Sequence, residues 1–208
     1  GTARPPEKPE KHVGRGLVLP LYVSGNHAPG WWAVCITMLA DASAFAALVF
    51  GYFYYWTIDE GFLDRAAHGT GAGWASAAAV TMIVAWASTL WAARANRQGQ
   101  VAHSRMLLGV AALAGALATY CMLAVPASTD LVPTAHVYDA TVWLVAGWTA
   151  LHLGVGLLMA VYCLARSAAG LLTPVYDADL RNTMLYWHFT LGQGLAALAM
   201  LVLFPAGD

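Results

Sequence analysis

The sequence has 208 residues, of which 60% are hydrophobic and 10% are charged; its formal net charge is −1 and its mean hydropathy is +0.59. Soluble domains carry about a quarter charged residues, so this composition excludes an ordinary soluble domain and indicates an integral membrane protein. The nearly neutral charge gives no basis for binding nucleic acid or acidic ligands. We therefore predict an all-α fold, a polytopic membrane helix bundle.

Residues 1–30 form a polar segment with prolines and charges of both signs. An apolar patch at residues 17–23 is too short to span a bilayer and is broken by Pro20, so we expect it to lie along the membrane surface or a partner. No short apolar run ends at a small-residue cleavage site, so no signal peptide is predicted. The expected organisation is a cytoplasmic or interfacial segment at 1–30, followed by one transmembrane domain at 31–208.

The first apolar run, residues 31–56, is long enough to cross a bilayer. As a helix it extends about 39 Å, against a hydrocarbon thickness of about 30 Å. Trp31 and Trp32 open the run and aromatic residues close it, as expected for rings at the two headgroup levels. Asp41 lies about 15 Å from its start, near the bilayer midplane, where a carboxyl group is costly. Two interpretations stay open: a proton-titrating or lipid-binding carboxyl, or a neutral acid hydrogen-bonded to a neighbouring helix.

Four more apolar runs of 20 residues or longer follow, at residues 74–93, 106–125, 140–165 and 183–204. With the first run they predict five transmembrane helices. Small residues spaced four apart predict close helix packing in two of the runs. They are Ser43, Ala47 and Gly51 in the first run, and Ala111, Ala114, Gly115 and Ala118 in the third.

Lysine and arginine are unevenly divided between the two sides of this bundle. If the N-terminus is cytoplasmic, nine of them lie in cytoplasmic segments and one, Arg65, lies outside. Because these residues are enriched in cytoplasmic loops, we predict a cytoplasmic N-terminus and a periplasmic C-terminus. The nine are Arg4, Lys8, Lys11, Arg15, Arg94, Arg97, Arg105, Arg166 and Arg181.

Two histidines lie inside apolar runs and are candidate functional residues. His152 is near the middle of the fourth run, where it is either a metal or haem ligand or a hydrogen-bonded packing residue. His188 lies in the segment Tyr-Trp-His-Phe near the predicted cytoplasmic boundary, where such a ring often anchors a helix. A redox centre in a helix bundle needs several convergent ligands, and neither the histidines nor the three cysteines show such spacing. We therefore predict no catalytic, metal-binding or cofactor-binding residue in this chain.

Arginines at the predicted cytoplasmic surface and tryptophans at the interface are candidates for binding lipid. The guanidinium group matches the geometry of phosphate and sits at headgroup depth in this topology. The candidates are Arg94, Arg97, Arg105, Arg181, Trp31, Trp32 and Trp187.

Three segments of the sequence resemble one known family. The run WWAVCITMLADASAFAALVFGYFYYW resembles a Trp-rich helix of subunit III of the haem–copper oxidases, the cytochrome c oxidase family, with Asp41 at the position of the family's Glu. Residues 147–152, GWTALH, resemble its GFHGLH segment: His152 matches the second histidine and Thr149 replaces the first. Residues 186–189, YWHF, resemble its YWHFVD segment, with Leu191 in place of the Asp.

The resemblance spans residues 19–204 and is to the five-helix form of subunit III. Segments 19–25 and 179–183 are similar to the branch in which subunit III follows subunit I, sometimes in one polypeptide. The resemblance implies an accessory subunit of a respiratory terminal oxidase in a bacterial inner membrane, with no cofactor of its own. The implied partners are subunit I with haem and copper, subunit II with copper, phospholipids, and other respiratory complexes.

Two other functions remain open from the sequence. One is the related five-helix accessory protein of nitric oxide reductases. The other is a small proton-coupled transporter that uses Asp41, although the chain lacks the two matching broken helices typical of transporters.

Overall fold

The computed structural model describes residues 10–66 and 71–204 and confirms the helical membrane bundle. Five helices in it are long and apolar enough to cross a membrane. They are α1 (Pro29–Ile58), α3 (Ala72–Arg97), α4 (Val101–Ala127), α5 (Val137–Ala168) and α6 (Ala178–Leu203). Nearly every helix end lies two to five residues beyond the predicted run, because hydropathy marks only the lipid-crossing part while backbone hydrogen bonding continues into the headgroup layer.

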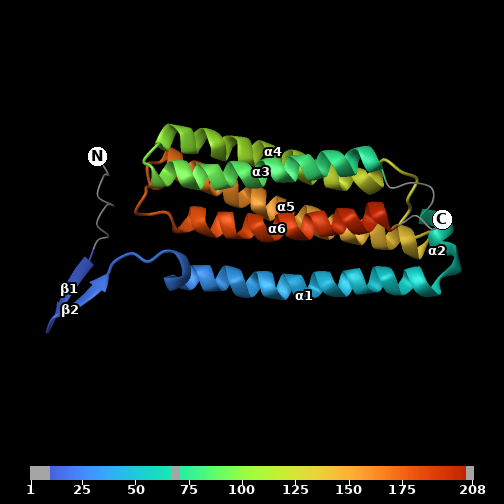
Figure 1. The fold of residues 1–208 in the computed structure, drawn as a ribbon, viewed down its shortest axis with the longest axis horizontal. Coiled ribbons are helices and arrows are strands. Elements are labelled where there is room, and N and C mark those ends of the chain that lie inside the picture. Colours follow the sequence, from blue (N-terminus) through green and yellow to red (C-terminus); the bar gives the residue numbers. More distant parts are fainter. Residues whose placement is uncertain (1–9, 67–70, 205–208) are drawn as a thin grey trace.

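The five helices lie side by side, with α1 at one edge and α3 and α4 at the opposite edge (Figure 1). α3 packs most extensively on α4, whereas α1 packs on α5 and α6. No residue in the most apolar window of α1 is buried inside the chain, against 39–50% in the other four helices. α1 therefore presents most of its surface to lipid or to another protein.

The small-residue prediction is confirmed for one helix and stays a prediction for the other. On α4 the four predicted small residues are all buried in the bundle, since they let neighbouring backbones approach closely. On α1, Ser43 and Ala47 are exposed and Gly51 is half-buried in the part of the chain that the structure describes. Small residues at helical spacing thus mark a face able to pack, but not the partner that covers it.

The centre of the bundle is filled by Trp187 of α6, which is completely buried. A Cβ atom added at Gly156 of α5 would lie 3.1 Å from its indole ring, and one added at Gly115 of α4 would lie 3.3 Å from it. The two glycines therefore make room for the ring. The prediction that Trp187 contacts lipid is wrong, because its ring reaches no outer surface of the chain.

The N-terminal segment begins with two short strands that the sequence did not predict. β1 (Glu10–Gly14) pairs with β2 (Leu17–Pro20) in an antiparallel ribbon, and every strand residue is exposed. The turn between them needs three successive residues with positive φ, and glycine supplies two of them. The ribbon extends past the start of α1 and away from the helices, and a 3-10 helix, η1 (Gly25–His27), leads into α1 (Figure 1).

One further short helix, α2 (Glu60–Ala66), lies in the segment predicted as a loop after α1. The Asp59 side chain accepts a hydrogen bond from the backbone N–H of Gly61 at 3.0 Å, which supports the start of this helix. Phe62 is fully buried and holds α2 against the bundle. α2 lies at the end opposite to the arginine-rich end, a name used below for the end that carries Arg94, Arg97, Arg105, Arg166 and Arg181.

Candidate functional site

Two candidate residues that the sequence left separate meet between α1 and α5. The Oδ2 atom of Asp41 lies 3.2 Å from Nε2 of His152. His152 is almost fully buried, whereas 27% of the Asp41 side chain is exposed. The carboxyl group therefore faces a protein partner, as expected for an acid near the bilayer midplane.

The hydrogen bonds of His152 determine where the protons of this pair lie. Its Nδ1 atom is 2.8 Å from the carbonyl oxygen of Trp148, and a carbonyl only accepts, so Nδ1 must carry a proton. The contact with Asp41 then needs one more proton, either on the carboxyl group or on Nε2. Both arrangements leave the pair with no net charge, which lowers the cost of placing it in a membrane.

The pair is surrounded by residues of the other segments that carry the family resemblance. The Tyr186 hydroxyl of α6 donates to the carbonyl oxygen of His152 at 3.3 Å. Ring centroids of Trp148 and Phe189 lie 5.0 Å and 6.3 Å from that of His152. Residues from the three segments that carry the family resemblance, on α1, α5 and α6, thus lie close together inside the bundle.

His188 does not belong to this place, although it was a candidate of the same kind. Its Nδ1 donates to the carbonyl oxygen of Met184 at 2.7 Å, and its ring meets the Trp86 ring edge-on at a centroid distance of 5.8 Å. It lines a cavity of about 460 Å³ between α1, α3 and α6 at the arginine-rich end. This position of His188 agrees with the expectation that it lies near one membrane boundary.

The cavity brings together three of the predicted lipid-binding residues, Trp31, Arg97 and Arg181. Arg181 is paired with Asp177 at 2.6 Å, so its charge is balanced. Arg97 donates from Nε to its own helix at 3.2 Å and has no ion-pair partner in residues 10–66 and 71–204. The cavity wall therefore combines apolar surface with an excess of positive charge, which suits the head of an anionic amphiphile.

The remaining lipid candidates lie elsewhere. Arg105 donates to the backbone of Ser167 at 2.8 Å, and so ties α4 to α5. Trp32 is 56% exposed, and its ring N–H donates to the carbonyl oxygen of Asn26 at 2.9 Å, as an interfacial anchor does. Arg94 is exposed and does not line the cavity.

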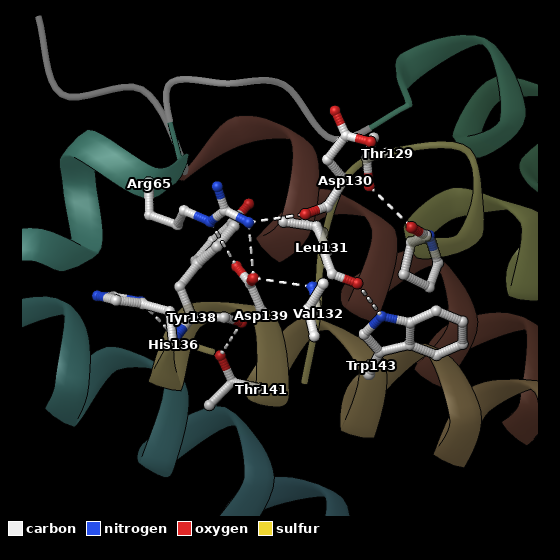
Figure 2. Close-up of polar contacts among 11 residues, drawn as sticks. Arg65, Thr129, Asp130, Leu131, Val132, His136, Tyr138, Asp139, Thr141 and Trp143 are labelled. Carbon is white, nitrogen blue, oxygen red and sulfur yellow. Dashed lines mark hydrogen bonds and ion pairs between the residues drawn. The ribbon is translucent and has the colours of Figure 1, made fainter. Parts of the chain in front are cut away.

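A polar cluster at the opposite end was not predicted from the sequence. Figure 2 shows Arg65 of α2 reaching Asp139 at the start of α5, with Nε donating to Oδ1 at 2.9 Å and Nη2 to Oδ2 at 2.8 Å. The same guanidinium donates to the carbonyl oxygen of Asp130, and the Val132 N–H donates to Asp139. The hydrogen bonds to Asp139 raise the pKa of the Arg65 guanidinium, so the cation keeps its charge.

This cluster fastens α2 to the loop between α4 and α5. The Asp139 side chain is fully buried, so its charge needs the partner that Arg65 supplies. Two signals in the sequence pointed to it: Arg65 is the one basic residue on its side of the bundle, and Asp139 stands in the first turn of a helix. We interpret the cluster as structural, because the Arg65 guanidinium and the Asp139 carboxylate are hydrogen-bonded within it.

In the described ranges, no group of three His, Cys, Asp or Glu side chains is arranged to hold a metal ion. No protein-family model matches this sequence, and no curated protein was found to be similar to it.

Proposed function

We propose that this chain is an accessory, cofactor-free subunit III of a respiratory haem–copper terminal oxidase. The observation that supports it is the meeting of Asp41, His152, Tyr186 and Phe189. These residues come from the three segments that resemble subunit III, and they contact one another across three helices. Segments that resembled the family by chance would have no reason to place their marked residues together.

In this function the chain supports a catalytic partner rather than carrying out redox chemistry. Haem and copper belong to subunit I and further copper to subunit II. The exposed surface of α1 would pack against a neighbouring subunit, since the rest of the bundle leaves it uncovered. The complex would reside in a bacterial inner membrane, with the arginine-rich end in the cytoplasm.

Lipid binding is the second part of the proposal. The cavity at the arginine-rich end lies between three helices and opens beside Trp31, at the expected headgroup depth. A phosphate held by Arg97 would neutralise the cation of the wall that has no ion-pair partner among the described residues. A lipid bound there would fix the start of α1 against α3 and α6, and so stabilise the subunit that α1 contacts.

The test is purification of the native complex through a tag on this chain, followed by absorption spectroscopy and metal analysis. The proposal predicts haem together with copper on the co-purifying chains. Haem with non-haem iron and no copper would assign the chain to a nitric oxide reductase. A chain that purifies alone would favour a transporter.

An Asp41→Asn variant provides an independent check on the assembled complex. The change keeps the shape of the side chain and an acceptor for His152, so assembly should be retained. Oxygen reduction should continue, with a modest loss of sustained turnover or proton coupling, because Asp41 is not in the redox subunit. Complete loss of oxygen reduction in an assembled complex would contradict an accessory role.

A further inference from the structure

Beyond the residues discussed so far, α6 carries a buried polar stripe along one face. Its members recur every three or four residues, so they lie one above another on the helix. Within the bundle all but the first are at most 6% exposed. The stripe consists of Asp179, Thr183, Tyr186, Thr190 and Gln193.

The stripe begins in water and ends deep in the membrane. Asp179 pairs with Arg166 at 3.0 Å, and about a third of each side chain is exposed at the arginine-rich end. Thr183 donates to the carbonyl oxygen of Asp179 at 2.8 Å and touches the Cys163 thiol at 3.3 Å. Gln193 lies about 21 Å further along the axis than Asp179 by helical rise, near the bilayer centre.

The deepest member of the stripe lacks a hydrogen-bond partner among the described residues. Neither the Nε2 nor the Oε1 atom of Gln193 is hydrogen-bonded there. The Thr190 hydroxyl, one turn before Gln193, interacts with the Tyr186 hydroxyl. A buried amide left unpaired is costly, so such groups bind ordered water when the protein offers no partner. The unpartnered amide of Gln193 therefore points to water held inside the bundle.

Helix register places Gln193 at about the same depth as the Asp41–His152 pair. A Cβ atom at Gly30 of α1 would lie 3.5 Å from the Asn182 side chain of α6, which fixes the two parallel helices at one level. Eleven residues further along both helices stand Asp41 and Gln193, about 17 Å deeper by helical rise. The Tyr186 hydroxyl of the stripe contacts the carbonyl oxygen of His152 at 3.3 Å, so the stripe reaches the pair.

We propose that the α6 stripe is a water-assisted proton conduit joining the aqueous surface at Asp179 to the Asp41–His152 pair. Hydroxyl groups and water can each accept one proton and release another, which is how buried polar chains relay protons in membrane proteins. The Gln193 amide does not gain or lose charge at neutral pH, so it serves as the positioning residue for the last water and not as a relay group. In one exchange a solvent proton enters at the Asp179 end and the proton shared by the pair leaves, so the charge of the pair is unchanged.

The proposal concerns this chain alone and holds whether or not the partner is an oxidase. The experiment follows deuterium exchange in the intact purified protein by infrared spectroscopy after transfer from H2O to D2O. Bands of the pair are identified by their loss in Asp41→Asn. Thr190→Val removes a hydroxyl of the relay, and Gln193→Leu removes the amide that holds the last water. Each variant should therefore slow exchange of these bands by about tenfold or more.

Two variants serve as controls. Thr190→Ser keeps the hydroxyl and should keep the wild-type rate. Thr89→Val removes an equally buried hydroxyl on α3, one that donates to the Ala85 carbonyl oxygen, and should also leave the rate unchanged. Wild-type rates in Thr190→Val and Gln193→Leu would overturn the proposal, because the pair would then exchange through the exposed side of Asp41. Should Gln193→Leu fail to fold, the comparison of Thr190→Val with Thr190→Ser decides the question.

Discussion

Asp41 and His152 share one contact of 3.2 Å but occupy different surroundings, since 27% of the Asp41 side chain is exposed and 4% of His152 is. The buried imidazole is already bonded on its other side to the backbone of its own helix. The contact therefore links α1, which lies at the edge of the bundle, to a residue fixed within the bundle.

A double-mutant cycle on this pair should reveal a measurable coupling. Asp41→Leu, His152→Leu and the double variant are compared in the free energy of unfolding in detergent micelles. Hydrogen bonds between membrane helices contribute about 0.6 kcal/mol on average and up to about 1.7 kcal/mol, and we expect a coupling energy in this range. Additive effects of the two single changes would show that the contact contributes nothing to stability.

Carbodiimide labelling reports on the protonation and surroundings of Asp41. A hydrophobic carbodiimide reaches carboxyl groups inside a membrane and reacts with the protonated form, so we expect it to label Asp41 while a water-soluble reagent does not. His152→Leu should increase labelling, because a carboxyl without a partner at that depth must be neutral. Mass spectrometry of the labelled peptide measures the yield, and Asp41→Asn is the blank. Equal yields with and without His152 would contradict the shared-proton arrangement.

Arg97→Gln should reduce the anionic phospholipid that co-purifies with the chain. The variant removes a cation of the cavity wall that has no ion-pair partner in the described part of the chain, and it keeps most of the side-chain length. Arg94→Gln is the matched control, because Arg94 has the same charge one turn away but does not line the cavity. Lipid mass spectrometry after equal detergent washing gives the comparison. Similar losses in both variants would indicate general surface attraction instead of a site.

Arg65→Leu should lower the thermal unfolding temperature by several degrees, since it leaves the buried Asp139 charge without its partner. Arg166→Leu breaks the ion pair with Asp179, in which about a third of each side chain is exposed. This variant should change the unfolding temperature far less. Circular dichroism on heating measures both. The interpretation of Arg65 as a fastening is wrong if the two variants unfold alike.

Topology can be mapped with single cysteines in a background lacking Cys35, Cys121 and Cys163. Four exposed positions lie between the membrane-spanning helices: Glu60 and Thr134 at one end, and Gln98 and Ala169 at the arginine-rich end. In intact cells an impermeant thiol reagent should label the first two and spare the others. Labelling of Gln98→Cys or Ala169→Cys would reverse the orientation.

Hydropathy alone was enough to predict the five helices, because a membrane-crossing helix must satisfy its backbone internally and be apolar along its length. The same pattern carries no information on which faces meet. It identified Asp41 and His152 as separate candidates, yet their contact depends on the arrangement of α1 beside α5. Trp187 was misjudged for a related reason: tryptophan near a helix end is typical of the interface, and only the glycines of two other helices reveal its pocket.

The position of α1 at the edge of the bundle also affects the order in which the protein is made. At about 5–20 residues per second, roughly 6–22 s of synthesis separate Asp41 from His152, its partner 111 residues later. During this interval α1 is already in the membrane with its carboxyl group unpaired, so the group must stay protonated. α1 thus gains its contacts with α5 and α6 only when those helices have been made, and another subunit that binds it early would shield Asp41 until α5 arrives.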